Sequence, residues 1–116
     1  MQLMINDMPI WLASKAVDFR KSIDGLCQIV IDDLSCQPGR GVFIFYNRER
    51  NRLKLLCWHV NGFMLIYKKF ETGKLTLCNR ADGKVKLNTE QLQWLLLGVD
   101  WVTLSSDGNC PIEYFC

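Results

Sequence analysis

Residues 40–73 read RGVFIFYNRERNRLKLLCWHVNGFMLIYKKFETG, and this stretch decides the fold. Three mostly apolar segments alternate with turn-forming residues, as in strands joined by short connections. The polar run Asn47–Asn51 predicts a loop, and the pair Asn61-Gly62 favours a two-residue hairpin turn. The three predicted antiparallel strands are Gly41–Tyr46, Arg52–His59 and Phe63–Phe70.

Upstream of this stretch, the sequence predicts one amphipathic helix. Apolar residues recur at helical spacing between Ile23 and Leu34. Ser22 or Asp18 can cap the start of this helix, and Pro38-Gly39 ends it.

Downstream, the signals at both ends predict a second helix. Asn88 is a favourable N-cap residue, and Gln91 follows at the capping-box spacing. Leucines then recur on one side, and Gly98 is a natural C-terminal stop.

Together these segments predict an α+β fold, an antiparallel β meander of about five to six strands with two principal helices packed on it. Residues 9–104 are expected to form one domain, and residues 105–116 a C-terminal extension. We expect both helices to cover the same face of the sheet. The remaining strands are predicted at Pro9–Ala13, Lys74–Cys78, Val85–Leu87 and, as a strand or a packed arm, Val99–Leu104.

The hairpin turn also predicts the register of its two strands. A two-residue turn at Asn61-Gly62 places Trp58 opposite Leu65 and Lys54 opposite Lys69. Two opposed lysines weaken a sheet by up to ~1 kcal/mol, and an anion between them would relieve the repulsion. The alternative is that both lysines extend into water.

Charge is concentrated in the middle of the chain. The net charge is only +2, but residues 40–86 hold eleven basic and three acidic residues, a segment charge of +8. Alternate side chains of a strand share one side, so basic residues at every second position from Arg48 would form a stripe that continues into Trp58. Such a stripe suits a nucleic-acid backbone, whereas a merely solvated sheet face is the alternative. The expected nucleic-acid-binding residues are Arg48, Arg50, Arg52, Lys54, Trp58, Lys68 and Lys69.

Other kinds of site find no support in the sequence. The six cysteines form no CxxC pair and His59 is the only histidine, so we expect no metal site and no cofactor. No convergent acids and no nucleophile–base pair mark a catalytic centre. Apolar runs fall short of the ~18 residues of a membrane span, and no secretory signal is evident. We therefore expect a cytoplasmic protein with reduced, mostly buried thiols.

Three separated motifs resemble one protein family. Residues 17–26, VDFRKSIDGL, resemble the D-x-R-K-x-x-D-G-L signature of TnpB-type accessory proteins from the sixty-six family of bacterial insertion sequences. Residues 42–69 are similar to the family's central block, which contains F-V-F-x-N-R, and residues 91–101 to its closing Q-L-x-x-L-L-x-G-I-D-W motif. The chain departs from the pattern at Cys57 and at His59-Val60. The motif residues expected to have structural roles are Asp18, Arg20, Lys21, Asp24, Gly25, Gly62, Asp100 and Trp101.

The resemblance implies a noncatalytic accessory protein that promotes DNA transposition beside a separate transposase, which carries the DNA-cutting chemistry. The expected partners are that transposase, other proteins of the same element, and DNA. Two alternatives stay open: a protein–protein adaptor without DNA contact, and a small nuclease, for which the sequence shows no acidic cluster.

Near its turn the predicted hairpin is apolar on both faces, so the face that the helices leave open needs a cover. We expect a symmetric homodimer to supply it, because two short helices blanket only one face of a small sheet. The alternative is that residues 102–116 fold back over that face.

Overall fold

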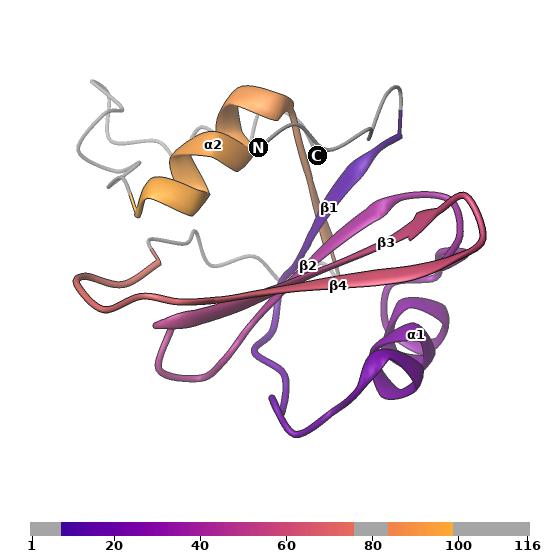
Figure 1. Cartoon of the computed structure of the whole chain (residues 1–116), viewed down its shortest axis with the longest axis horizontal. Helices are drawn as coiled ribbons and strands as arrows, with labels where there is room; N and C mark the ends of the chain where they lie inside the picture. Colours follow the sequence, from indigo (N-terminus) through magenta and orange to yellow (C-terminus); the bar gives the residue numbers. More distant parts are fainter. Residues whose placement is uncertain (1–7, 76–83, 99–116) are drawn as a thin grey trace.

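The chain forms an α+β fold in which two helices pack on a five-stranded sheet, as predicted (Figure 1). The structure is a computed structural model, and it describes residues 8–75 and 84–98. In chain order the elements are β1 (Ile10–Ala13), α1 (Ile23–Asp32), β2 (Val42–Tyr46), β3 (Arg52–His59), β4 (Gly62–Lys69), β5 (Lys84–Leu87) and α2 (Thr89–Leu97).

The sheet is not a simple meander, because its strand order is β4-β3-β2-β1-β5. The segment β2–β3–β4 is antiparallel and consecutive, as expected. However, β1 runs parallel to β2, and β5 pairs with β1 at the far side of the sheet. A parallel pair needs a crossover connection, and α1 provides it here.

Several predicted features fall outside or at the limit of the described residues. Lys74 and Leu75 belong to no strand, and the rest of the strand predicted at Lys74–Cys78 lies outside the described residues. The same holds for Val99–Leu104, which includes Asp100 and Trp101, and for the extension at residues 105–116.

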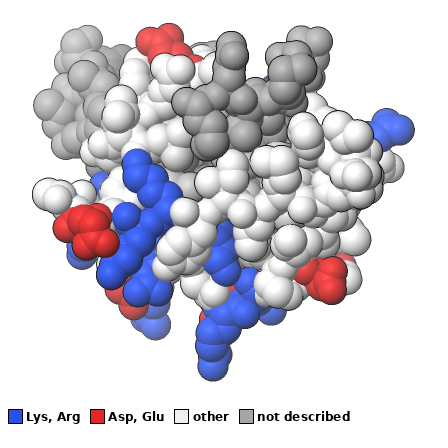
Figure 2. Space-filling view, in the orientation of Figure 1, with Lys and Arg blue, Asp and Glu red and all other residues white. Residues whose placement is uncertain are grey.

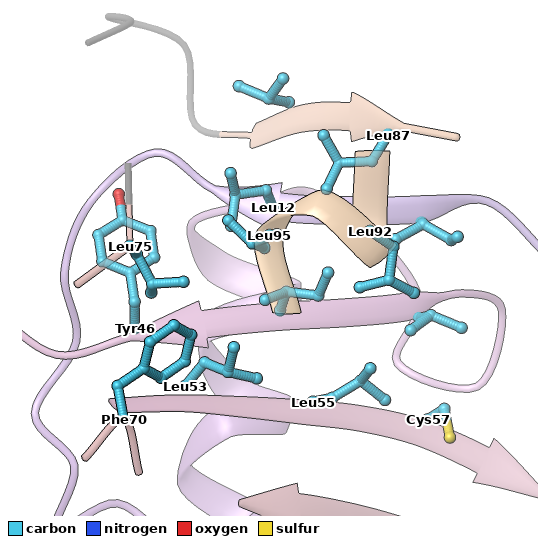
Figure 3. Packing of buried hydrophobic residues seen from close by; sticks show 14 residues of the cluster. Leu12, Tyr46, Leu53, Leu55, Cys57, Phe70, Leu75, Leu87, Leu92 and Leu95 are labelled. Carbon is cyan, nitrogen blue, oxygen red and sulfur yellow. The ribbon is translucent and has the colours of Figure 1, made fainter. Parts of the chain in front are cut away.

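The two helices cover opposite faces of the sheet, so the expectation that they share one face is wrong (Figure 1). We call the buried cluster that contains Leu92 and Leu95 of α2 the α2-side core, and the cluster that contains Leu26 and Val30 of α1 the α1-side core. Alternate residues of β3 point to opposite faces, so Leu55 packs in the α2-side core and Leu56 in the α1-side core. Figure 3 shows Leu92 and Leu95 of α2 directed toward the sheet within the α2-side core. The crossover between β1 and β2 places α1 on one face, and the turn after β5 returns α2 to the other.

This arrangement removes only part of the reason for which a dimer was expected, because each face of the sheet now has one helix. Leu56 of β3 is completely buried under α1, whereas Trp58 and Tyr67 on the same face remain 39% and 48% exposed. Homodimerisation itself stays a prediction.

The hairpin register also differs from the predicted one by two residues. Val60 and Asn61 form the turn and Gly62 begins β4, so Lys54 lies opposite Tyr67 and not opposite Lys69. Val60 adopts a positive φ of 52°, which an Asn or Gly would adopt more easily. The pairing of eight residues along each strand therefore outweighs the local turn preference. Because the shift is even, every side chain keeps its predicted face.

The ends of the helices follow the sequence signals closely for α2 and less so for α1. Asn88 Oδ1 accepts from the Gln91 N–H at 2.7 Å, and Gln91 Oε1 accepts from the Asn88 N–H at 2.9 Å. Gly98 ends α2 in the left-handed conformation, with φ of 71°. Ser22 is the N-cap residue of α1, but its side chain makes no capping hydrogen bond.

Candidate nucleic-acid interface

The loop between β2 and β3 is organised by Asn47, a residue absent from the predicted site. Asn47 Oδ1 accepts hydrogen bonds from the backbone N–H groups of Asn51 and Arg52, each at 3.0 Å, and the side-chain amide donates to Asn51 Oδ1 at 2.6 Å. The side chain is 8% exposed. Two signals in the sequence could have identified the role of Asn47. It is a polar residue directly after a wholly buried strand, and it belongs to the N-R motif of the family pattern.

This loop interrupts the predicted basic stripe. The strand begins only at Arg52, and Arg50 adopts a positive φ of 61°. Arg48 and Arg50 therefore do not alternate with Arg52 along an extended strand. Burial in the α2-side core raises the pKa of the Tyr46 phenol, and the nearby charge of Arg50 opposes this rise.

Lys54 is buried in the middle of the expected stripe. Its ammonium donates to the backbone carbonyls of Phe19 at 2.9 Å and Lys21 at 3.0 Å, and lies 4.9 Å from the centre of the Phe19 ring. Only 8% of the residue is exposed. In this conformation Lys54 holds the segment before α1 against the sheet and does not present its charge at the surface.

Lys68 lies on the opposite face from Lys54. Its ammonium donates to the carbonyl of Leu96 in α2 and lies 4.8 Å from the centre of the Phe70 ring. Of the six predicted cations, the three that share the α1 side and keep exposed or half-exposed side chains are Arg48, Arg52 and Lys69.

Arg52 and Lys69 are directly opposite each other in the sheet. Arg52 and Arg48 also line an open depression of about 480 Å³ between the β2–β3 loop and residues 17–19. Like charges opposed across two strands destabilise a sheet. Among the described residues the one ion pair is Asp18–Arg20, so none of their acids forms an ion pair with these cations.

The motif before α1 borders the same depression through Asp18. Asp18 accepts from the backbone N–H of Arg20 at 2.9 Å and from its guanidinium at 2.7 Å. The hydrogen bonds from the Arg20 side chain and backbone lower the pKa of Asp18 to about 2. Lys21, whose carbonyl receives Lys54, has an exposed side chain.

Asp24 and Gly25 have structural surroundings. Asp24 lies in the first turn of α1, where a negative charge is favoured by the helix dipole. A Cβ added to Gly25 would come within 3.2 Å of Lys21 Cβ, so glycine lets the start of α1 pack closely against the preceding turn.

We refer to Arg48, Arg52 and Lys69 as the basic cluster. Figure 2 shows Lys and Arg side chains gathered below the sheet, mainly at the lower left, where Figure 1 places the β2–β3 loop and the end of β4. The cluster combines two segments of the chain: the β2–β3 loop with the start of β3, and the end of β4.

Trp58 lies apart from the basic cluster. It is six residues from Arg52, roughly 20 Å along β3, and the intervening Leu56 is completely buried. Trp58 is 39% exposed and packs edge-to-face on Phe63, with ring centres 5.1 Å apart.

The described residues contain no group of three His, Cys, Asp or Glu side chains that could hold a metal ion. Burial raises the pKa of the Cys57 thiol, and burial together with the charge of Asp24 raises that of Cys27. Both thiols are therefore poorer nucleophiles than an exposed cysteine. Within residues 8–75 and 84–98, neither helix has the length and apolarity needed to cross a membrane.

The combination of this fold with the motif before α1 and the Asn47-Arg48 loop agrees with the family comparison. Residues 8–106 match the family described as IS66 Orf2 like protein. The chain belongs to this family. It is thus an accessory-type protein of an insertion sequence, and the resemblance stated from its motifs is confirmed.

Two similar proteins come from Sinorhizobium fredii (strain NBRC 101917 / NGR234). The uncharacterized protein y4jC is 32% identical over 93 residues, which span 79% of this chain and 80% of the relative. The uncharacterized protein y4hO is 28% identical over 93 residues, which span 79% of this chain and 81% of the relative. No solved structure matches the chain significantly.

Proposed function

We propose that this IS66 Orf2-like protein promotes transposition of its element without catalysing the DNA chemistry, and that it contacts DNA through the basic cluster. The observation that carries the proposal is the opposition of Arg52 and Lys69, neither of which has an ion-pair partner among the described residues. A phosphate group placed there would relieve the repulsion and gain charge-assisted hydrogen bonds. Such contacts position a nucleic acid without reading its sequence.

The second candidate function is a protein–protein adaptor that docks the transposase. The depression beside the cluster is also lined by Asp18 and Glu49, so its rim carries both signs of charge. A mixed rim suits a protein surface better than a polyanion. In this case the basic cluster would pair with acids of the transposase.

Two paired charge variants separate these functions. Arg48→Gln with Arg52→Gln removes two charges from the cluster. Arg40→Gln with Lys86→Gln removes two exposed charges elsewhere, before β2 and on β5. With a labelled duplex from the end of the element, the cluster variant should flatten the plot of log affinity against log salt by about 0.9 for each lost phosphate contact.

The same variants are then placed in an otherwise intact element. The cluster variant, like deletion of the gene, should sharply reduce transposition, and the control variant should not. If neither DNA affinity nor its salt dependence changes while transposition falls, the cluster docks a protein. If deletion of the gene leaves transposition unchanged, the proposed role in the process is wrong.

A further inference from the structure

Exposed aromatic side chains lie on the same face of the sheet as the basic cluster. The described residues contain five exposed large apolar side chains, and three of them, Trp58, Val60 and Tyr67, belong to the β3–β4 hairpin. Tyr67 is 48% exposed and Trp58 39%. Both point to the α1 side, because Tyr67 lies opposite Lys54 and Trp58 opposite Phe63.

These residues form a strip along the edge of the sheet. On β4 the α1-side residues are Phe63, Leu65, Tyr67 and Lys69, and β4 is the end strand of the sheet. Leu56 on β3 is completely buried by the α1-side core, but Leu65 beside it remains half-exposed. The core beneath α1 therefore ends near β3 and leaves the strip on β4 open to a ligand.

The strip is cationic at one end and aromatic along the rest. Lys69 and Arg52 mark the cationic end, and Tyr67 follows two residues from Lys69, about 6.6 Å along the strand. Phe63 and Trp58 form the other end, about 13 Å beyond Tyr67. A phosphate held between Arg52 and Lys69 thus has an exposed aromatic ring within the reach of its own nucleotide.

We propose that the basic cluster and this aromatic strip together bind single-stranded nucleic acid, with the backbone on the cations and unpaired bases on Tyr67 and Trp58. This inference rests on the proposed function and specifies its ligand. Unpaired bases expose their faces to aromatic side chains, whereas the faces of bases in a duplex are stacked on one another. Rings that stand on an open sheet edge therefore favour a single strand over a duplex.

The packing of Tyr67 supports a stacking role. Phe19 approaches its ring edge-to-face, with centres 6.1 Å apart, and the Lys54 ammonium lies 5.9 Å from the ring centre. These contacts orient the ring from the protein side while nearly half of the residue stays exposed. A ring held in this way loses little further conformational entropy when a base stacks on it.

The test compares a fluorescein-labelled thymidine 12-mer with a duplex of the same length, using the full chain. The single strand should bind at least tenfold more tightly than the duplex. Tyr67→Leu keeps an apolar side chain against Phe19 but cannot stack, and should weaken single-strand binding by about 5- to 150-fold, the range that one base–aromatic contact contributes. Tyr67→Phe should bind as the parent does.

Trp58 provides a second readout. The parent's tryptophan fluorescence should change on addition of the thymidine 12-mer, and most of that change should be lost in Trp58→Phe. Ile31→Ala, at a residue of α1 that is 50% exposed, is the control for loss of a surface apolar group and should leave affinity unchanged. Circular dichroism verifies that each variant is folded.

Distinct results would overturn this inference and the proposed function. The single-strand inference is overturned if the protein binds both ligands with equal affinity, and if that affinity falls in Arg48→Gln with Arg52→Gln but not in Tyr67→Leu. In that case the proposed DNA contact through the basic cluster is retained. Binding to neither ligand overturns the single-strand inference and the DNA contact of the proposed function. Reduced transposition with Tyr67→Leu, in the absence of single-strand binding, would assign the strip to a protein partner and overturn the inference.

Discussion

At the scale of single residues, Lys54 shows how a basic residue in a basic segment can be structural. Its ammonium is buried without a carboxylate and is satisfied by two carbonyls and an aromatic ring. Those carbonyls belong to Phe19 and Lys21, in the motif before α1. Lys54 thereby links the motif that precedes α1 to the strand that carries Arg52.

We expect Lys54→Met to lower the free energy of unfolding by about 1–3 kcal/mol, because it leaves two buried or half-buried carbonyls without a donor. Lys86→Met, at an exposed lysine of β5, is the matched control and should change it by less than about 0.5 kcal/mol. Urea unfolding at neutral pH measures both. Equal effects would mean that the Lys54 contacts contribute nothing to stability.

Asp18 gives a prediction that depends on pH. Its pKa in the folded protein, about 2, lies below the ordinary value of 3.8 because Arg20 donates to the ionised carboxylate. A lowered pKa means that the carboxylate stabilises the fold above the ordinary value, and that this contribution is lost as the pH falls through about 2. The contribution is fully present near pH 7, and stability depends on the Asp18 charge only in acidic solution, between pH values of about 3.8 and 2.

Titration of the Asp18 carboxyl carbon by NMR should give a midpoint near 2 in the parent protein. Arg20→Gln should move that midpoint toward 3.8, since the hydrogen bond from Arg20 is the largest cause of the shift. Lys21→Gln, which removes the smallest cause, should move it far less. A midpoint near 3.8 in the parent would show that the Asp18–Arg20 pair does not persist in solution.

At the scale of helices and strands, the sequence predicted features that depend on neighbouring residues. The capping box at Asn88 and the C-terminal glycine cap at Gly98 are each determined by a few neighbouring residues, and the structure contains both. The side of the sheet that each helix covers is determined by residues that are distant in the sequence, because it depends on β1 pairing in parallel with β2. The hairpin register was missed because the Asn61-Gly62 preference is weaker than the pairing of two whole strands.

The same distinction applies to the candidate site. Alternation correctly assigned Arg52, Lys54 and Trp58 to one face, but it could not show that Lys54 is buried by a segment more than thirty residues away. The same pattern also extended the predicted strand back through the β2–β3 loop. There the hydrogen bonds of Asn47 hold the backbone in a turn, so side chains do not alternate between the two faces. Exposure and long-range contacts, not periodicity, divide the basic residues between surface and core.

The cap of α2 gives a prediction at this scale. Asn88→Ala should lower the free energy of unfolding by about 1 kcal/mol, because it removes the acceptor for the Gln91 N–H and opens the reciprocal bond. Gln93→Ala, at an exposed position of the same helix, should change it by less than about 0.5 kcal/mol. Thermal unfolding followed by far-ultraviolet circular dichroism compares them, and equal midpoints would contradict a stabilising cap.

At the scale of the whole molecule, one sheet joins two cores that no helix bridges. The α1-side core contains Leu26 and the α2-side core contains Leu95, each at most 1% exposed. Successive residues of β3 enter different cores, so loss of one core removes support from the strand that both cores share. We therefore expect the two cores to unfold together and not as separate units.

Leu26→Ala and Leu95→Ala should each lower the free energy of unfolding by about 2–5 kcal/mol. Trp11 packs against the α1-side core and Trp94 against the α2-side core. Fluorescence in a Trp94→Phe background therefore emphasises the α1-side core, and fluorescence in a Trp11→Phe background emphasises the α2-side core. In both backgrounds Leu26→Ala should shift the urea midpoint equally, as two-state unfolding requires. Gln28→Ala, exposed on α1, is the control and should shift neither midpoint. If Leu26→Ala shifts only the transition seen from Trp11, the cores are independent, and damage to the α1 side would leave α2 folded on its face of the sheet.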